Sequence, residues 1–565
     1  MKFRKIILVL LLLGLTIVPR LSSLDSFVTI DEPFWLSVGA NYYYALGQRE
    51  LENTVYEYHP AVTTMSFITA AFLVDFPDYR GYGQGYFDVD KEKFDPFLTA
   101  YGHDPLHLLY LSRLFQVAMI VLFALIIFYL LSIFVGEEKA FLATALISSA
   151  PYFLGHSRVL SHEAMVAFFV LASILGFMAY LEYERKWSYL FISAASAALA
   201  QLTKSSAMAM FPVIALMLAI SVFENRKTSG LVPAIVDHLK ILAVWFFGLA
   251  VVYFILWPGM WVAPGKMLYE VYGNAFSYAF QGARLQVTHE LQPSTFSLAS
   301  MGGSIGKYLS QIVHKETPIA WMGILLAVGS FFLRGVGASS SKLKKLMLYL
   351  LVNAFMFILL FSAAQGRNSP HYIMASHVSM DAIAALGWCI LFGWLSTKNG
   401  YLSRRIFFIG SAAALIVFQL ASAIAFYPYY YSYYNPFYAS GYSDYGEGFE
   451  QAALYLSQKP NAELLKVVSF RGRGPFSYFF PGQTIILNPL FMEEDGMSSM
   501  IERLNGADYL VINDALGPRT EKTELFVASL ADIEPEHSIH IKGLYDIHIY
   551  RVADLTPAFY DAISK

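Results

Sequence analysis

Two adjacent carboxylates, Asp31 and Glu32, follow the first long apolar stretch of the chain. Pro33 and Trp35 come next, a pattern typical of a short helix or rigid turn at a membrane interface. Ionised side chains beside hydrocarbon are costly, so they usually mark a functional site. A carboxylate here could act as a general base on an incoming hydroxyl. Alternatively, the pair only caps the interfacial helix through its dipole, and the spacing favours neither interpretation.

Cationic side chains recur between the later apolar stretches. Arg158 and Glu163 are spaced to form a simple ion pair at a helix start, but they could equally supply a cation for a phosphate and a second acid. Lys204 falls in so short a connection that its ammonium would lie near the hydrocarbon boundary. An anionic lipid or substrate phosphate explains this lysine as well as snorkelling to the headgroups does. Further candidates on the same side are Lys315, Arg367, His371 and Tyr372.

Tyr58, His59 and Pro60 open a further apolar stretch, residues 61–74, which is too short for a confident membrane span. A helix lying on the membrane and covering a cavity fits this stretch better. Tyr58 and His59 are therefore candidates for the cavity wall, although a lone histidine before a helix is more often a structural hydrogen-bond donor.

The composition requires a membrane protein. Of 565 residues, 56% are hydrophobic and 14% are charged, whereas soluble domains carry roughly 25% charged residues. The net charge of −3 and the scattered basic residues exclude nucleic acid as a partner. Because Cys389 is the single cysteine, the chain has no intrachain disulfide and no thiolate-rich metal site.

Apolar windows of about 20 residues predict a mainly α, polytopic helical bundle with about 11 transmembrane helices. The short basic loops all fall on one side, which the positive-inside rule makes cytoplasmic. The long loops 25–106 and 258–318 then lie outside, as does the chain from residue 441 onwards. The windows lie near residues 6–24, 107–134, 139–154, 162–182, 187–203, 206–223, 238–258, 318–335, 343–363, 373–395 and 405–427.

The chain changes character after an aromatic run at 427–436. Short hydrophobic windows separated by polar turns predict a small soluble α/β domain outside the membrane. We therefore expect a transmembrane catalytic domain at 1–440 and an extracytoplasmic α/β domain at 441–565. The expected helices are 449–458 and 497–504, and the expected strands are 465–470, 484–487, 509–512 and a closing pair within 537–552.

Two acids and several cations on one face, beside apolar walls, suit group transfer from a lipid-linked phosphosugar. The phosphate would lie against lysine, arginine or histidine while a carboxylate takes the acceptor proton. Fixed cations would neutralise the leaving group, which is the largest expected contribution. The competing class is a multi-pass transporter or lipid-linked sugar flippase, because buried charges also mark permeation paths. A non-catalytic assembly or sensor protein is the third possibility.

The motifs resemble the GT-C superfamily of polytopic glycosyltransferases, in particular the dolichyl-phosphate-mannose protein mannosyltransferases and bacterial aminoarabinose transferases. The resemblance runs from about residue 5 to 450, with the motifs in the family's order. The chain departs from the family pattern in two places. It has His59-Pro60-Ala61 where relatives often have His-Pro-Pro. Many relatives have Arg-Tyr in the last outer turn, whereas here Arg367 is separated from Tyr372. The matching pieces are Asp31-Glu32, Tyr58-His59-Pro60, Ser157-Arg158 with Glu163, 202–206, 257–261, Lys315 to Pro318, Arg367 to Tyr372, 428–436 and 446–448.

The resemblance implies an enzyme that moves a mannose-like hexose or a pentose, with inversion, from a polyprenyl-phosphate carrier to an acceptor hydroxyl. The acceptor would be a protein, a lipid or a glycan at the outer face of the membrane, and membrane lipids would surround the enzyme. Asp31 would be the base, Glu32 its neighbour and Glu163 a second acid. The implied phosphate and donor ligands are Arg158, Lys204, Lys315, Arg367, His371 and Tyr372.

No cofactor is required by the sequence. Asp31, Glu32 and Glu163 could share a divalent cation such as Mg²⁺ or Mn²⁺, but they are too few to demand one. The short loops favour a prokaryotic plasma membrane.

Overall fold

The structure is a computed structural model in which two compact units can be distinguished. The first unit comprises Met1–Ser22, Val38–Phe87 and Leu111–Pro436, and the second comprises Ser23–Ser37, Asp88–Tyr110 and Phe437–Lys565. Each unit is described by itself. The structure describes residues 2–56, 59–82, 93–273, 275, 298–332, 341–364, 369–396, 401–487, 497–514 and 521–563.

Seven helical segments are long and apolar enough to cross a membrane, within the described part of the chain. The chain is therefore an integral, multi-pass membrane protein. These segments contain α5 (Pro105–Val135), α8 (His162–Glu182), η3 (Ser205–Met210) with α10 (Phe211–Ser229), α11 (Leu231–Leu256), α17 (Ser341–Ala363), η5 (Pro370–Ile373) with α18 (Met374–Ser396), and α19 (Tyr401–Ile424).

The other four expected spans are also helical, but they are shorter or more charged. α1 (Lys2–Leu21) carries basic residues at both ends, whereas α9 (Trp187–Thr203) and α16 (Pro318–Phe332) are short. The expected span 139–154 is divided into α6 (Glu137–Ser149) and α7 (Pro151–His156). Proline disfavours helical backbone in the residue before it, and Ala150 is indeed non-helical. The polytopic bundle is confirmed, with seven candidate spans among the eleven expected.

The remaining helices of the first unit are short or interfacial. α15 ends at the predicted ligand Lys315, and α3 occupies the apolar stretch after His59. Outside the second unit, the structure also has α3 (Val62–Asp75), α12 (Gly259–Val262), α13 (Pro264–Leu268), α15 (Leu298–Lys315), η1 (Leu51–Asn53), η2 (Pro77–Gly81), η4 (Tyr269–Gly273) and η6 (Tyr430–Ser432), while α2 (Glu32–Gln48) is shared by the two units.

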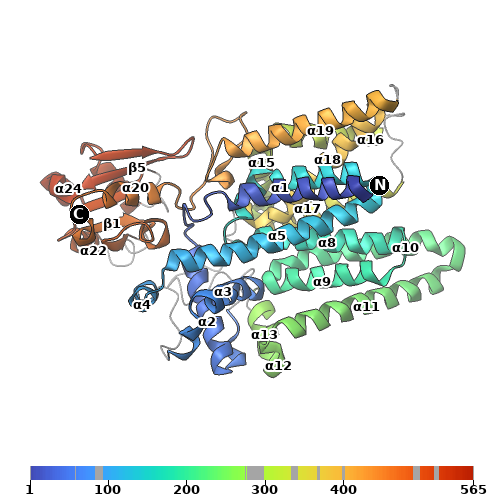
Figure 1. Cartoon of the computed structure of the whole chain (residues 1–565), viewed down its shortest axis with the longest axis horizontal. Coiled ribbons are helices and arrows are strands. Elements are labelled where there is room, and N and C mark those ends of the chain that lie inside the picture. The colour runs from blue at the N-terminus through green and yellow to red at the C-terminus, as the bar shows by residue number, and fades with distance from the viewer. Residues whose placement is uncertain are drawn as a thin grey trace. The chain divides into compact units, whose positions relative to one another are not determined.

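Helix pairs in the first unit pack along their lengths. α8 packs on α9, α9 on α11, and α10 on α11, and these helices form one neighbouring group (Figure 1). α16 meets α18 through glycines: a Cβ on Gly323 would lie 2.4 Å from the Ala384 carbonyl oxygen, and one on Gly387 would lie 2.0 Å from the Gly323 oxygen. Small residues let membrane helices approach this closely.

The second unit contains a five-stranded mixed sheet with the strand order β2-β1-β3-β5-β4. β1 is parallel to β2 and to β3, whereas β5 is antiparallel to β3 and to β4. The predicted α/β character of the tail is confirmed, while the boundary at residue 441 stays a prediction. The strands are β1 (Lys466–Phe470), β2 (Gln483–Leu487), β3 (Tyr509–Asn513), β4 (His537–His540) and β5 (Asp546–Arg551). The helices are α4 (Phe94–Ala100), α20 (Phe449–Ser457), α22 (Met497–Leu504), α23 (Glu521–Ser529), α24 (Pro557–Ile563), η7 (Ala462–Leu464), η8 (Gly472–Phe476) and η9 (Val552–Asp554).

The α16–α18 contact gives a matched pair of substitutions. Gly323→Ala should destabilise the protein by about 1–3 kcal/mol, because the new methyl group meets a backbone oxygen of α18. Gly329→Ala in the same helix should be neutral or stabilising, since nothing lies within 4 Å of its Cβ position. Thermal unfolding of both variants in detergent measures the difference. Equal unfolding temperatures would show that the two helices do not approach this closely.

Candidate active site

Glu163 and Lys204 form a buried ion pair at one end of the α8–α9 hairpin. Glu163 lies in the first turn of α8, and Lys204 is the residue that follows α9. A carboxylate at a helix N-terminus and an ammonium at a helix C-terminus are both favoured by the helix dipoles. Lys204 Nζ contacts Glu163 Oε1, and the two side chains are 8% and 12% exposed. The structure thus brings together the predicted second acid and a predicted phosphate ligand.

Aromatic and imidazole rings surround this pair. Lys204 Nζ lies 4.9 Å from the centre of the Tyr372 ring, and the His371 ring is 4.3 Å from Tyr372. The ring of His162, the residue before Glu163, stacks on that of His59, with the ring centres 6.1 Å apart. We call Glu163, Lys204, His59, His162, His371 and Tyr372 the Glu163–Lys204 cluster.

Lys315 lies in a second buried group of the same unit. Its ammonium donates to the carbonyl oxygens of Tyr431 and Tyr433, at 3.2 and 3.0 Å. It also lies 5.2 Å from the centre of the Tyr152 ring. The ring centres of Tyr152 and His156 are 4.8 Å apart, and those of His156 and His371 are 5.9 Å apart. Rings therefore connect Lys315 to the Glu163–Lys204 cluster.

Three titratable residues beside Lys315 were not predicted as site residues. His377 Nδ1 lies 2.7 Å from Glu316 Oε1, and the Glu316 carboxyl is hydrogen-bonded to that of Asp381. All three side chains are at most 4% exposed. The spacing of His377 and Asp381, one helical turn apart within an apolar segment, is the sequence signal that could have found them.

Arg158 makes contacts that brace the backbone. Its guanidinium donates to the carbonyl oxygens of Ser22 and Pro428 and lies 5.2 Å from the centre of the Tyr430 ring. Arg20, at the end of α1, is equally buried and donates to Ser157 Oγ at 2.8 Å. The phosphate role of Arg158 stays a prediction, and these contacts give the side chain a structural role as well.

Asp31 and Glu32 belong to the second unit, where they differ sharply. Glu32 is 0% exposed, and its Oε2 accepts hydrogen bonds from the Thr29 amide at 2.8 Å and the Thr29 hydroxyl at 2.9 Å. Asp31 is exposed, immediately before α2, and its carbonyl oxygen accepts the Trp35 amide. Of the two acids, Asp31 is therefore the one accessible to an acceptor hydroxyl. Glu32 instead fixes the turn.

Two predicted site residues, Tyr58 and Arg367, lie outside the described residues. The suggested divalent cation also stays a prediction: among the described residues, no group of three or more His, Cys, Asp or Glu side chains could hold a metal ion. Asp31 and Glu32 lie in one unit and Glu163 in the other.

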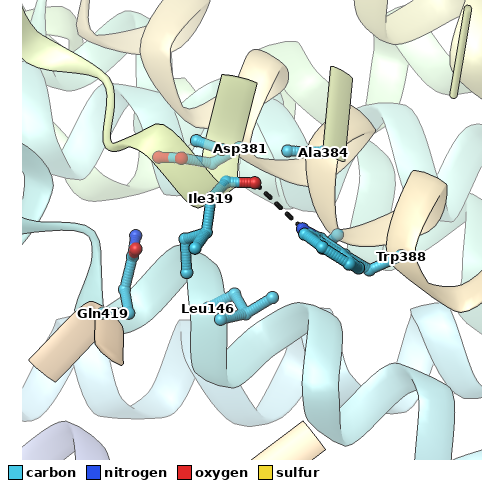
Figure 2. Close-up of a pocket in the computed structure, with 8 residues that line it drawn as sticks. Leu146, Ile319, Asp381, Ala384, Trp388 and Gln419 are labelled. Carbon is cyan, nitrogen blue, oxygen red and sulfur yellow. Dashed lines mark hydrogen bonds between the residues drawn. The ribbon is translucent and has the colours of Figure 1, made fainter. Parts of the chain in front are cut away.

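A small cavity of about 10 Å³ lies beside Asp381 in the first unit (Figure 2). Trp388 Nε1 donates to the Ile319 carbonyl oxygen at its edge, at 2.9 Å. Gln419 also lines it and accepts a hydrogen bond from Thr317. A cavity of this size has room for about one water molecule, so it is too small for a sugar.

The comparisons with known proteins agree with the predicted class. Residues 111–257 match the model of the family described as dolichyl-phosphate-mannose-protein mannosyltransferase. This stretch contains Arg158, Glu163 and Lys204. The match agrees with the predicted resemblance to the mannosyltransferases, and it covers this stretch of the chain.

Two solved structures resemble the chain. ArnT from Cupriavidus metallidurans, bound to undecaprenyl phosphate, is 12% identical with a TM-score of 0.42, over 97% of this chain and 98% of that one. The oligosaccharyltransferase AglB from Archaeoglobus fulgidus, in complex with an inhibitory peptide and a dolichol-phosphate, is 12% identical with a TM-score of 0.44, over 93% of this chain and 70% of that one. No curated protein matches the sequence significantly.

The Glu163–Lys204 pair predicts strong coupling between two substitutions. Lys204→Met should destabilise the protein by about 3–5 kcal/mol, because it leaves the Glu163 carboxylate buried without its cation. Adding Glu163→Gln should recover much of that loss, since the uncompensated charge is then gone. A double-mutant cycle on thermal unfolding in detergent measures the coupling. Strictly additive effects would show that the two side chains do not interact.

Proposed function

We propose that this protein transfers a mannose-like hexose or a pentose, with inversion, from a polyprenyl-phosphate carrier to an acceptor hydroxyl. The single observation that carries the proposal is the Glu163–Lys204 cluster, which lies partly within the residues that match the mannosyltransferase family. It brings together an ammonium, a carboxylate and three histidines near helix ends, where a lipid-linked donor could present its phosphate.

Lys204 and His371 are the proposed ligands of the donor phosphate, with Lys315 and Arg367 as further cations. An ammonium that is already held by Glu163 is positioned before the donor arrives, so it needs little reorganisation when charge develops on the leaving phosphate. Tyr372 and His59 supply ring surfaces beside the pair. Such rings suit the faces of a sugar or the start of an isoprenoid chain.

Asp31 is the proposed general base. Its carboxylate takes the proton of the acceptor hydroxyl, whose oxygen attacks the anomeric carbon on the face opposite the phosphate. The bond from that carbon to the phosphate oxygen breaks, and polyprenyl phosphate leaves with the electron pair. Inversion follows from this single displacement. Glu32, held by Thr29, keeps the turn in place.

The proposed location is a prokaryotic plasma membrane, with the site and residues 441–565 on the outer face. The proposed partners are the lipid-linked donor, a protein, lipid or glycan acceptor, and the surrounding membrane lipids. A divalent cation bound near Asp31, Glu32 or Glu163 would serve to neutralise phosphate charge.

A transporter or flippase is the second candidate function, and one observation favours it. The hydrogen-bonded carboxyls of Glu316 and Asp381, with His377 beside them, are buried ionisable groups of the kind that line proton and ion pathways. A transporter would move the lipid-linked sugar or its headgroup without breaking the sugar–phosphate bond. Release of free polyprenyl phosphate therefore separates the two functions.

Asp31→Asn should lower the release of polyprenyl phosphate by roughly 10²- to 10⁴-fold, because the acceptor hydroxyl loses its base. The measurement is product release by the purified protein, offered a panel of polyprenyl-phosphate sugars with mixed protein, lipid and glycan acceptors. Asp25→Asn is the matched control, an exposed acid in the same segment that should leave the rate unchanged. Full activity in Asp31→Asn would refute the base. The transporter would be favoured if folded wild-type protein releases no polyprenyl phosphate but moves the lipid-linked donor across the membrane of a vesicle.

A further inference from the structure

The turn that carries Asp31 is hydrogen-bonded to the tail of the chain. The Ile30 amide donates to the Tyr445 carbonyl oxygen at 3.1 Å. Tyr445 is itself fixed by the buried Glu447 carboxylate, which accepts its amide at 2.9 Å and the Tyr545 hydroxyl at 2.9 Å. Since Tyr545 immediately precedes β5, the sheet anchors the residue just before Asp31.

Arg473 reaches the same turn from η8. Its guanidinium donates to Asp95, with Nε at 2.9 Å from Oδ2 and Nη2 at 3.3 Å from Oδ1. Nη2 also donates to the carbonyl oxygen of Pro33, at 3.3 Å. Pro33 stands two residues after Asp31 in the first turn of α2. Arg473 therefore ties α4 and η8 to the start of the helix that Asp31 precedes.

The network around Arg473 is well satisfied and mostly shielded from water. The Arg473 and Asp95 side chains are 16% and 18% exposed. The Tyr478 hydroxyl donates to Asp95 Oδ1 at 3.1 Å. Burial, with the neighbouring Asp95 carboxylate, raises the pKa of Tyr478 well above its usual range, so Tyr478 stays a donor at every physiological pH. Forked, charge-assisted hydrogen bonds of this kind fix direction as well as distance.

Backbone packing reinforces these hydrogen bonds. Gly474 has a φ of +86°, and a Cβ on it would lie 2.2 Å from Pro33 Cγ and 3.1 Å from Val28 Cγ1. Only glycine permits both this backbone conformation and this approach. The residues on both sides of Asp31 are thus packed against η8.

We propose that Arg473 is a positioning residue for sugar transfer, which together with Asp95 holds Pro33 so that the Asp31 carboxylate faces the acceptor hydroxyl. The inference rests on the proposed function, and it assigns the second unit a part in the reaction. A base displaced by about 1 Å costs on the order of 10²-fold in rate. Donor binding is assigned to other residues, so the effect should fall on kcat and not on the KM for the donor.

The test compares three variants of the full-length protein in the polyprenyl-phosphate release assay. Arg473→Ala should lower kcat by about 10- to 100-fold with a donor KM within about twofold of wild type. Arg473→Lys should recover part of the rate, because an ammonium can pair with Asp95 but cannot reproduce the fork. Arg471→Ala is the matched control. Arg471 lies two residues before Arg473 but pairs with Asp444, so its loss should leave kcat unchanged.

The outcomes separate this inference from the proposed function. If Asp31→Asn is inactive while Arg473→Ala matches Arg471→Ala, the positioning role is overturned and the base stands. If Asp31→Asn is fully active, the base itself is wrong, and with it the inference. A raised donor KM with unchanged kcat would also overturn it. If Arg473→Ala does not fold, the folded Arg473→Lys variant decides: a wild-type kcat overturns the positioning role, and a reduced kcat with unchanged KM supports it.

Discussion

The cost of burying charge in an apolar helical bundle governs the first unit. An ammonium or carboxylate removed from water persists as an ion only when it has a partner of opposite charge or several hydrogen bonds. Glu163 and Lys204 meet this condition through each other and through the dipoles of α8 and α9. Lys315 meets it through two carbonyl oxygens of the aromatic run. Lys204 and Lys315 are thus fixed in place before any substrate binds.

The same constraint explains why the charges collect at helix ends. A spanning helix satisfies its own backbone groups except in its first and last turns, where amides and carbonyl oxygens remain available. Arg158 uses the carbonyl oxygens of Ser22 and Pro428, and Arg20 uses those of Thr16 and Ser148. Buried cations of the first unit can therefore brace helix ends as well as bind phosphate. A basic residue in this region therefore cannot be assigned to substrate binding by its charge alone.

The sequence predicted the helices and strands better than it predicted which side chains contact one another. Apolar windows at 162–182 and 187–203 coincide with α8 and α9, because hydrophobicity over about 20 residues is a local property. The strands β1 and β3 were likewise found within a residue of their bounds. Glu163 and Lys204 are 41 residues apart, so their pairing depends on the helix packing. Local spacing gives no access to a contact between residues so far apart. It offered an ion pair of Glu163 with the nearby Arg158 as one alternative instead.

The acid pair Asp31-Glu32 shows what a short sequence motif can predict and what depends on the fold. Glu32 turns inward and holds Thr29, which is a structural role, whereas Asp31 stays exposed and remains the candidate base. Adjacent residues at a helix start point in different directions, so one of them can satisfy the turn while its neighbour faces outward. The rigidity of that outward side chain then depends on what holds the turn, and those groups lie more than 400 residues later in the chain, at Tyr445 and Arg473. The local motif offers Asp31 as a candidate base, whereas the orientation of its side chain is a property of the folded second unit.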